Sequence, residues 1–304
     1  MMVEAAGRLP FRYRAYGLTL ASSIELPELR PSYAEPVVTV RSGPVPAVLD
    51  APHKIGALFQ AAPGEYLLRI AGIGAYWVRG GTDIVIEPAP GCAATTVRSF
   101  LLGSPLTALL HQRGALVLHA AAMAGGRGAV LIAGHSGAGK STTVATLMRR
   151  GHRVLADDAA AVVSDAGVLT VQPGFPQINL WRDALDRLGE SGEAMPRARE
   201  RIDKYQWPVG GSFTDAPQRP AHLVILGLSN EARVCCEPVV QRDAFLAIRG
   251  LTRNRRAAEG LGVAAMNFSV TTSLAATVPI LRLTRPRGSD TTGEIADTIA
   301  ALLD

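Results

Sequence analysis

Apolar positions in the first 92 residues recur with a period of two, which is the spacing of half-buried strands. The segment Phe11–Tyr16 alternates aromatic residues with small or charged ones, and Gly80–Asp83 has the composition of a hairpin turn. Glycines and prolines separate the other candidate strands, which are 37–40, 66–70, 75–78 and 84–86. This part contains no nucleophile–base pair and no cluster of ligand side chains. Residues 1–92 therefore predict a small β-rich module that serves packing or partner recognition.

After residue 92 the pattern changes to helical spacing alternating with short apolar runs, which predicts an α/β domain over residues 93–304. Helices are predicted near 97–102, 104–113, 142–150, 182–188, 243–249, 257–274 and 291–302. Strands are predicted at 115–120, 128–133, 152–156, 160–163, 168–171, 222–228, 234–240 and 279–283. Residues 189–220 show little periodicity and predict a long surface excursion.

The segment Gly134–Ser141 reads GHSGAGKS and fits the phosphate-binding pattern G-x-x-x-x-G-K-[ST] at every fixed position. It stands between a predicted strand and a predicted helix, so backbone N–H groups and the helix N-terminus can surround a phosphate. Lys140 would reach the β- and γ-phosphates of a nucleotide, and the Ser141 hydroxyl would ligate Mg²⁺. The residues expected to contact the nucleotide are Gly134, His135, Ser136, Gly137, Ala138, Gly139, Lys140, Ser141 and Thr142.

Composition is consistent with a folded protein that binds an anionic ligand. Of the 304 residues, 48% are hydrophobic and 19% are charged, which allows a sizeable core. The net charge of +5 suits anionic nucleotides or acidic peptides and does not require nucleic acid. The three cysteines form neither a metal-binding spacing nor a disulfide framework, which fits a reducing compartment. Without a signal-peptide pattern or a run of 18 apolar residues, we expect a cytoplasmic protein with no membrane partner.

Two further features restrict the chemistry. Asp157 and Asp158 end a short apolar strand sixteen residues after Ser141, and His119 lies in the strand that precedes the glycine loop. In phosphate-loop folds an acidic residue at the end of a neighbouring strand holds Mg²⁺. Ser141 and one of the two aspartates are therefore predicted to be the metal ligands. We assign Asp158 to the metal, although the roles of Asp157 and Asp158 could be exchanged.

These residues resemble the catalytic domain of the HPr serine kinase/phosphorylase family. That family has a Leu-His-Gly strand, then G-x-S-G-x-G-K-S, then R-G-H-R-L-V-A-D-D. The counterparts are Leu118-His119-Ala120, Gly134–Ser141 and Arg150–Asp158, the last reading RGHRVLADD. The resemblance implies a P-loop kinase core, in which helices flank a mixed sheet, and ATP and Mg²⁺ as ligands.

The same resemblance implies catalytic roles for three residues. Asp157, by analogy with the first aspartate of the family pair, would be the general base that accepts the proton of a serine hydroxyl. Lys140 would stabilise the charge on the transferred phosphoryl group. His119 would orient an aspartate or contact phosphate, although a strand histidine can equally be a buried core residue.

The chain departs from the bifunctional enzymes of this family in its short N-terminal module and in the absence of a recognisable substrate-binding signature near its C-terminus. It is more similar to the stand-alone HPr-kinase-like proteins of lasso-peptide biosynthesis. That similarity implies phosphorylation of a serine, commonly the C-terminal one, on a ribosomally made precursor peptide or small protein. Alternatives are an HPr-type kinase/phosphorylase, a non-catalytic ATP-sensing module and a small-molecule or carboxykinase-like enzyme. The ring-forming family also allows a homo-oligomer.

Several basic residues are secondary candidates for ligand contacts. Lys204 could reach the peptide or the γ-phosphate, and we expect one arginine of the later segments to touch phosphate. The arginines concerned are Arg249, Arg253, Arg255, Arg256, Arg285 and Arg287.

Overall fold

The computed structural model describes residues 9–135, 137–187, 189, 195, 197–199 and 202–304. Contacts group the chain into two compact units, Met1–Ala115 with Asn254–Asn267 and Leu116–Arg253 with Phe268–Asp304. The sequence predicts a domain boundary at residue 92, where the strand pattern changes to a helical pattern. The contacts instead place the two helices after residue 92, together with a short later segment, in the first unit.

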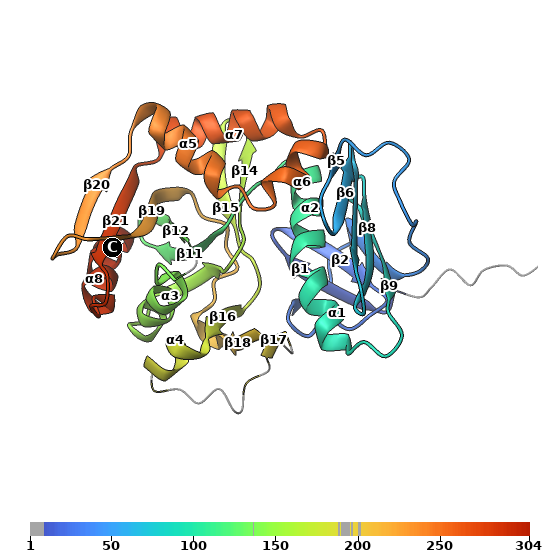
Figure 1. Cartoon of the computed structure of the whole chain (residues 1–304), viewed down its shortest axis with the longest axis horizontal. Coiled ribbons are helices and arrows are strands. Elements are labelled where there is room, and N and C mark those ends of the chain that lie inside the picture. Colours follow the sequence, from blue (N-terminus) through green and yellow to red (C-terminus); the bar gives the residue numbers. More distant parts are fainter. Residues whose placement is uncertain (1–8, 136, 188, 190–194, 196, 200–201) are drawn as a thin grey trace, which may run out of the picture. The chain divides into compact units, whose positions relative to one another are not determined.

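The first unit contains a nine-stranded sheet in the order β3-β1-β2-β4-β9-β8-β7-β6-β5 (Figure 1). Its strands are β1 (Phe11–Ala15), β2 (Leu18–Ser22), β3 (Arg30–Pro31), β4 (Val38–Ser42), β5 (Lys54–Ile55), β6 (Phe59–Ala62), β7 (Glu65–Ile70), β8 (Gly74–Arg79) and β9 (Asp83–Pro88). Its helices are α1 (Ala94–Leu101), α2 (Ser104–Gln112) and α6 (Arg255–Gly260). The predicted hairpin at Gly80–Asp83 is confirmed, because β8 and β9 pair antiparallel around it.

The second unit is organised around a mixed six-stranded sheet in the order β13-β11-β12-β19-β21-β20. These strands are β11 (Ala120–Gly125), β12 (Gly128–Gly134), β13 (Arg153–Ala156), β19 (Pro220–Ser229), β20 (Cys235–Pro238) and β21 (Ile280–Pro286). β12 runs parallel to β19, and β19 runs parallel to β21, whereas β11 is antiparallel to both β12 and β13.

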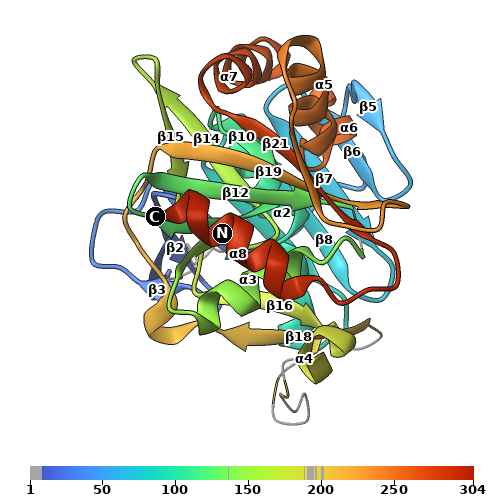
Figure 2. The same ribbon diagram turned by 90° about the vertical axis from the view of Figure 1, so that its left-hand side faces the viewer.

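Helices cover both faces of this sheet, and alternate residues of the central strands face the two cores (Figure 2). On β12, Val130 and Ile132 pack with α3 (Lys140–Arg149) and α8 (Thr292–Leu303). Leu131, between them, belongs to the core formed with α5 (Gln241–Leu251) and α7 (Ala264–Thr277). The period of two therefore supplies an apolar side chain to each face in turn, and the mixed α/β architecture expected for this part is confirmed.

Two three-stranded sheets flank the site described below. One has the order β10-β14-β15 and consists of β10 (Leu116–Leu118), β14 (Ala160–Asp165) and β15 (Val168–Gln172). The other has the order β16-β18-β17 and consists of β16 (Gln177–Trp181), β18 (Ile202–Pro208) and β17 (Arg197–Arg199), with α4 (Arg182–Arg187) after β16 and a 3-10 turn (Gly210–Ser212) after β18. Among the described residues, no helix has both the length and the apolar character needed to cross a bilayer.

The structure corrects three sequence-based predictions. The helix predicted at 257–274 is two helices, α6 and α7, separated by a turn in which Gly262 has a φ of +79°. The strand predicted at 115–120 is two strands, because the chain leaves the β14 side at His119 and joins the central sheet as β11. In the predicted surface excursion at 189–220, residues 197–199 and 202–208 form the paired strands β17 and β18. The excursion was inferred from weak periodicity, whereas β18 is held by pairing with β16 and by burial of Tyr205.

Candidate active site

Four segments that carry polar side chains meet at one edge of the six-stranded sheet. β12 and β13 are both antiparallel to β11, so both end where β11 begins. The loop after β12, the carboxylates after β13 and His119 before β11 therefore lie together. β21 is aligned with β12 through β19, which brings Arg285 to the same edge. Carboxyl ends of neighbouring parallel strands are a common position for ligand sites.

The glycine loop is the turn Gly134–Ser141 between β12 and α3. A Cβ on Gly134 would lie 2.9 Å from the carbonyl oxygen of Leu226, so a larger residue would clash with the adjacent strand. Gly137 and Gly139 have φ values of +83° and +97°, in the left-handed region that favours glycine. Gly139 is the N-cap of α3, and the first N–H groups of a helix have no acceptor within it. The turn thus presents backbone donors at a helix N-terminus, a geometry suited to an anion.

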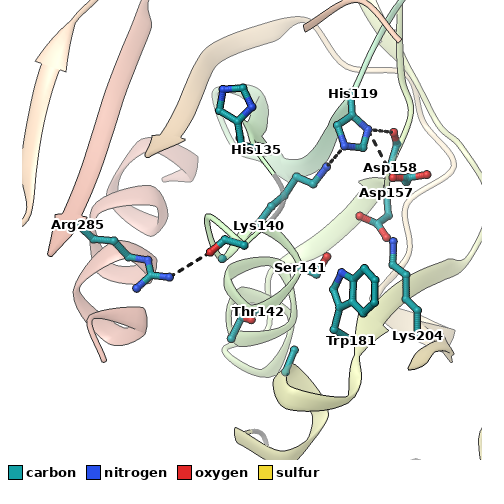
Figure 3. Close-up of a pocket in the computed structure, with 14 residues that line it drawn as sticks. His119, His135, Lys140, Ser141, Thr142, Asp157, Asp158, Trp181, Lys204 and Arg285 are labelled. Carbon is teal, nitrogen blue, oxygen red and sulfur yellow. Dashed lines mark hydrogen bonds and ion pairs between the residues drawn. The ribbon is translucent and has the colours of Figure 1, made fainter. Parts of the chain in front are cut away.

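Lys140 is the first residue of α3, and its side chain points toward His119 (Figure 3). Its Nζ lies 3.3 Å from Nε2 of His119. Partial burial lowers the pKa of Lys140, Asp157 and Asp158 act in the opposite direction, and Lys204 and Arg253 lower it further. The Lys140 ammonium group is therefore near two carboxylates that favour its charge and two cations that oppose it.

His119 connects Lys140 to Asp158. Its Nδ1 lies 3.2 Å from the carbonyl oxygen of Asp158 and 3.5 Å from Oδ1 of the same residue. Burial, followed by the charge of Lys140, lowers the pKa of His119 and favours a neutral ring. Nε2 faces the Lys140 ammonium, which is a donor, whereas Nδ1 lies between the acceptor oxygens of Asp158 and the donor Nη1 of Arg253, 2.9 Å away.

Asp158 is fixed by Arg253, which follows α5. Nη2 of Arg253 lies 2.7 Å from Oδ2 of Asp158, and Nη1 donates to the Asp158 carbonyl oxygen at 2.6 Å. Asp158 has a φ of +65°, which is uncommon outside glycine. Burial alone would raise the pKa of Asp158, but the charges of Arg253, Lys204, His119 and Lys140 outweigh burial and lower it well below its usual range. This carboxylate therefore stays ionised.

Asp157 has a different environment. Its Oδ2 accepts a hydrogen bond of 2.9 Å from the backbone N–H of Asn179 on β16. Burial and the neighbouring charge of Asp158 raise the pKa of Asp157, while Lys140 and Lys204 oppose that rise. The two adjacent carboxylates are thus separated in proton affinity by their surroundings, as in sites where one group transfers a proton and the other remains charged.

A cavity of about 290 Å³ collects these groups. Its lining includes His119, Gly134, His135, Gly137, Gly139, Lys140, Ser141, Thr142, Asp157, Asp158, Trp181, Ala184, Lys204 and Arg285. Arg285 approaches the glycine loop, with Nη2 3.4 Å from the carbonyl oxygen of Gly137 and Nε 3.4 Å from that of Ala138.

Most residues expected from the sequence to form the site are therefore close together. One of them, Ala138, is buried in the core cluster beneath the loop and is not among the residues that line the cavity, and Ser136 lies outside the described residues. Arg253 and Arg285 are the arginines that reach the site. Trp181 carried no sequence signal. Lys204 was only a secondary candidate, since its place depends on the pairing of β16 with β18.

The donor set fits a nucleotide with Mg²⁺. The described residues contain no group of three His, Cys, Asp or Glu side chains that could hold a metal ion without other ligands. Ser141 and Asp158 both line the cavity, and Mg²⁺ commonly takes one or two protein oxygens together with phosphate oxygens and water. These two residues could hold the metal, and the glycine loop with Lys140 could hold the phosphates.

Comparison with known proteins gives little guidance. No family model matches the chain, and a search of curated proteins finds no relative. Among solved structures, the chain is similar to the Hpr(Ser) kinase/phosphatase from Coxiella burnetii at 12% sequence identity and a TM-score of 0.32, over 61% of this chain and 94% of that chain. A likeness this weak carries no argument about activity, so function rests on the geometry and the residues of the site.

Proposed function

We propose that the protein is a kinase that uses ATP and Mg²⁺ to phosphorylate a serine hydroxyl on a peptide or small protein. The observation that carries the proposal is the meeting of the glycine loop, Lys140 and the Asp157-Asp158 pair in one cavity. Phosphoryl transfer depends mainly on positioning and electrostatic stabilisation. This cavity offers backbone donors, cations and two carboxylates of different proton affinity.

Each residue has a role that follows from its surroundings. Lys140 would stabilise negative charge on the transferred phosphoryl group, and Ser141 with Asp158 would hold Mg²⁺. The metal ion supplies charge neutralisation at the phosphate oxygens when it is bound. Asp157 would accept the proton of the acceptor hydroxyl. Because its Oδ2 is engaged by Asn179, we assign that proton to Oδ1.

The acceptor class is supported by the sequence. The segment Arg150–Asp158 and the Leu118-His119 pair resemble HPr serine kinases. The short N-terminal module departs from the bifunctional enzymes, and the chain is more similar to the stand-alone HPr-kinase-like proteins of lasso-peptide biosynthesis. The preferred acceptor is therefore a lasso precursor peptide, at its C-terminal serine. An HPr-type kinase/phosphorylase and an ATP sensor without transfer activity are the alternatives that an experiment must separate.

The test incubates the protein with γ-labelled ATP and Mg²⁺, in parallel with a serine-terminated precursor peptide and with HPr. Asp157→Asn should lower transfer by roughly 10²- to 10⁴-fold, the usual contribution of a general base, while nucleotide affinity changes little. Asp165→Asn, which changes an exposed residue at the end of β14 in the same unit, is the matched control and should transfer normally.

The labelling results distinguish the preferred acceptor from the two alternatives. Label on the peptide alone supports the preferred acceptor, and label on HPr alone supports the alternative kinase. Nucleotide binding without transfer to either acceptor favours the sensor. Wild-type transfer by Asp157→Asn would refute the assignment of Asp157 as general base.

A further inference from the structure

One wall of the cavity is formed by a pair of side chains from the sheet β16-β18-β17. Trp181 and Lys204 are directly paired across the antiparallel strands β16 and β18. Lys204 Nζ lies 6.0 Å from the centre of the Trp181 ring, within the range of a cation–π interaction. Both side chains line the cavity, and the Lys204 ammonium points toward Asp157 in Figure 3.

The alternation of these strands fixes which residues face the cavity. Ile178 and Leu180 on β16 and Tyr205 on β18 are at most 2% exposed and belong to the core cluster under α3. Because side chains alternate along a strand, the residues adjacent to these buried ones lie on the opposite face of the sheet. Trp181 and Lys204 therefore face the cavity as a consequence of the burial of their neighbours.

Lys204 differs from the other cations of the site in its partners. Lys140 contacts His119, Arg253 is paired with Asp158, and Arg285 contacts the carbonyl groups of the glycine loop. The Lys204 ammonium group makes no hydrogen bond or ion pair with the described residues, although the residue is half-buried. A half-buried ammonium group without a hydrogen-bonded partner is a site for an anion.

The charge of the cavity indicates what kind of anion would bind there. Lys140, Lys204 and Arg285 line the cavity together with the carboxylates of Asp157 and Asp158, and the Asp158 charge is already paired with Arg253. Lys204 is near enough to Lys140 for their charges to repel. In a partly buried space such an excess favours a ligand with more than one negative charge. The phosphates of a nucleotide meet that requirement.

We propose that Lys204 binds the terminal phosphoryl group of the nucleotide from the side of Asp157, opposite the glycine loop, and that Trp181 positions its ammonium group. This inference rests on the proposed nucleotide site. It adds a ligand contact from outside the glycine loop and distinguishes a nucleoside triphosphate from a diphosphate. Lys204 thereby makes the site specific for the triphosphate.

The test measures nucleotide binding by calorimetry with Mg²⁺ present, using ADP and the non-hydrolysable triphosphate AMP-PNP. Lys204→Met should weaken AMP-PNP binding about tenfold or more, the size expected for a lost charge-assisted hydrogen bond, and should change ADP binding less than about twofold. Lys204→Arg should retain most of the discrimination. Lys54→Met, which replaces a half-exposed lysine of the first unit, is the matched control and should bind both nucleotides normally.

Protection from an amine-reactive reagent gives a second measurement that needs no substitution. AMP-PNP should slow the modification of Lys204 but not that of Lys54, and ADP should protect Lys204 less. Equal weakening of ADP and AMP-PNP in Lys204→Met, or an unchanged AMP-PNP affinity, would overturn the proposal. If the wild type binds neither nucleotide, the proposed function and this inference both fail. If it discriminates through Lys204 but transfers no phosphate, only the proposed kinase activity fails.

Discussion

Removal of the Arg253 side chain should destabilise the second unit through the charge it leaves behind. Asp158 and Arg253 are 2.7 Å apart, and their side chains are 30% and 18% exposed. Breaking a fully buried ion pair costs about 3–5 kcal/mol, whereas an exposed pair contributes at most about 1 kcal/mol. For this partly exposed pair we expect Arg253→Met to lower the free energy of unfolding by about 2 kcal/mol.

The pH dependence of this loss follows from the carboxylate. The folded-state pKa of Asp158 lies below its unfolded value of about 3.9. Its stabilising contribution is therefore complete at neutral pH and disappears as the pH falls through the folded-state pKa. The difference in stability between wild type and Arg253→Met should accordingly be full near pH 7 and shrink as the pH falls below about 4.

Urea denaturation followed by tryptophan fluorescence measures this effect. In a Trp77→Phe background, the remaining indoles are Trp181 and Trp207, both in the second unit. The matched control is Arg150→Met, which breaks the more exposed 2.6 Å pair between Arg150 and Asp297. That variant should lose less than about 1 kcal/mol. An equal loss in both variants, or a loss in Arg253→Met that persists unchanged at low pH, would refute the reasoning.

Two further predictions concern backbone conformation and a second, partly buried carboxylate. Gly137 and Gly167 have φ values of +83° and +82° and no atom within 4 Å of an added Cβ, so Gly→Ala should cost each about 1 kcal/mol in urea denaturation. Gly137→Ala alone should also weaken Mg·ATP binding in calorimetry. Equal effects of Gly137→Ala and Gly167→Ala on binding would contradict a ligand role for the glycine loop. Burial would raise the pKa of Asp83, but hydrogen bonds led by that from Arg79 lower it, so its stabilisation is present at neutral pH and lost in acid. Asp83→Asn should remove about 1 kcal/mol at pH 7 and progressively less as the pH falls below about 4, monitored through Trp77; a loss that stays unchanged on acidification would contradict this.

The central part of the site could be predicted from the sequence because its determinants are local. A glycine loop is set by glycine spacing within eight residues and by the apolar strand and helix that flank it. The carboxylates follow a short apolar strand, and chain order alone places that strand after α3. These features need no information about pairing between distant segments, so the sequence is sufficient to propose Lys140, Asp157 and His119.

The other residues of the site were decided by tertiary structure, because their positions depend on pairing between segments far apart in the chain. Trp181 and Lys204 are neighbours only through the register of β16 with β18, and the weak periodicity of β18 gave no sign of that register. Arg253 was one of several arginines in a basic run, and the path of the chain after α5 singled it out. Sequence by itself determined a strand, a glycine loop, a helix and a pair of aspartates. Only long-range burial and strand pairing determined which cations surround them, since the burial of Tyr205 and its neighbours turns Lys204 toward the cavity.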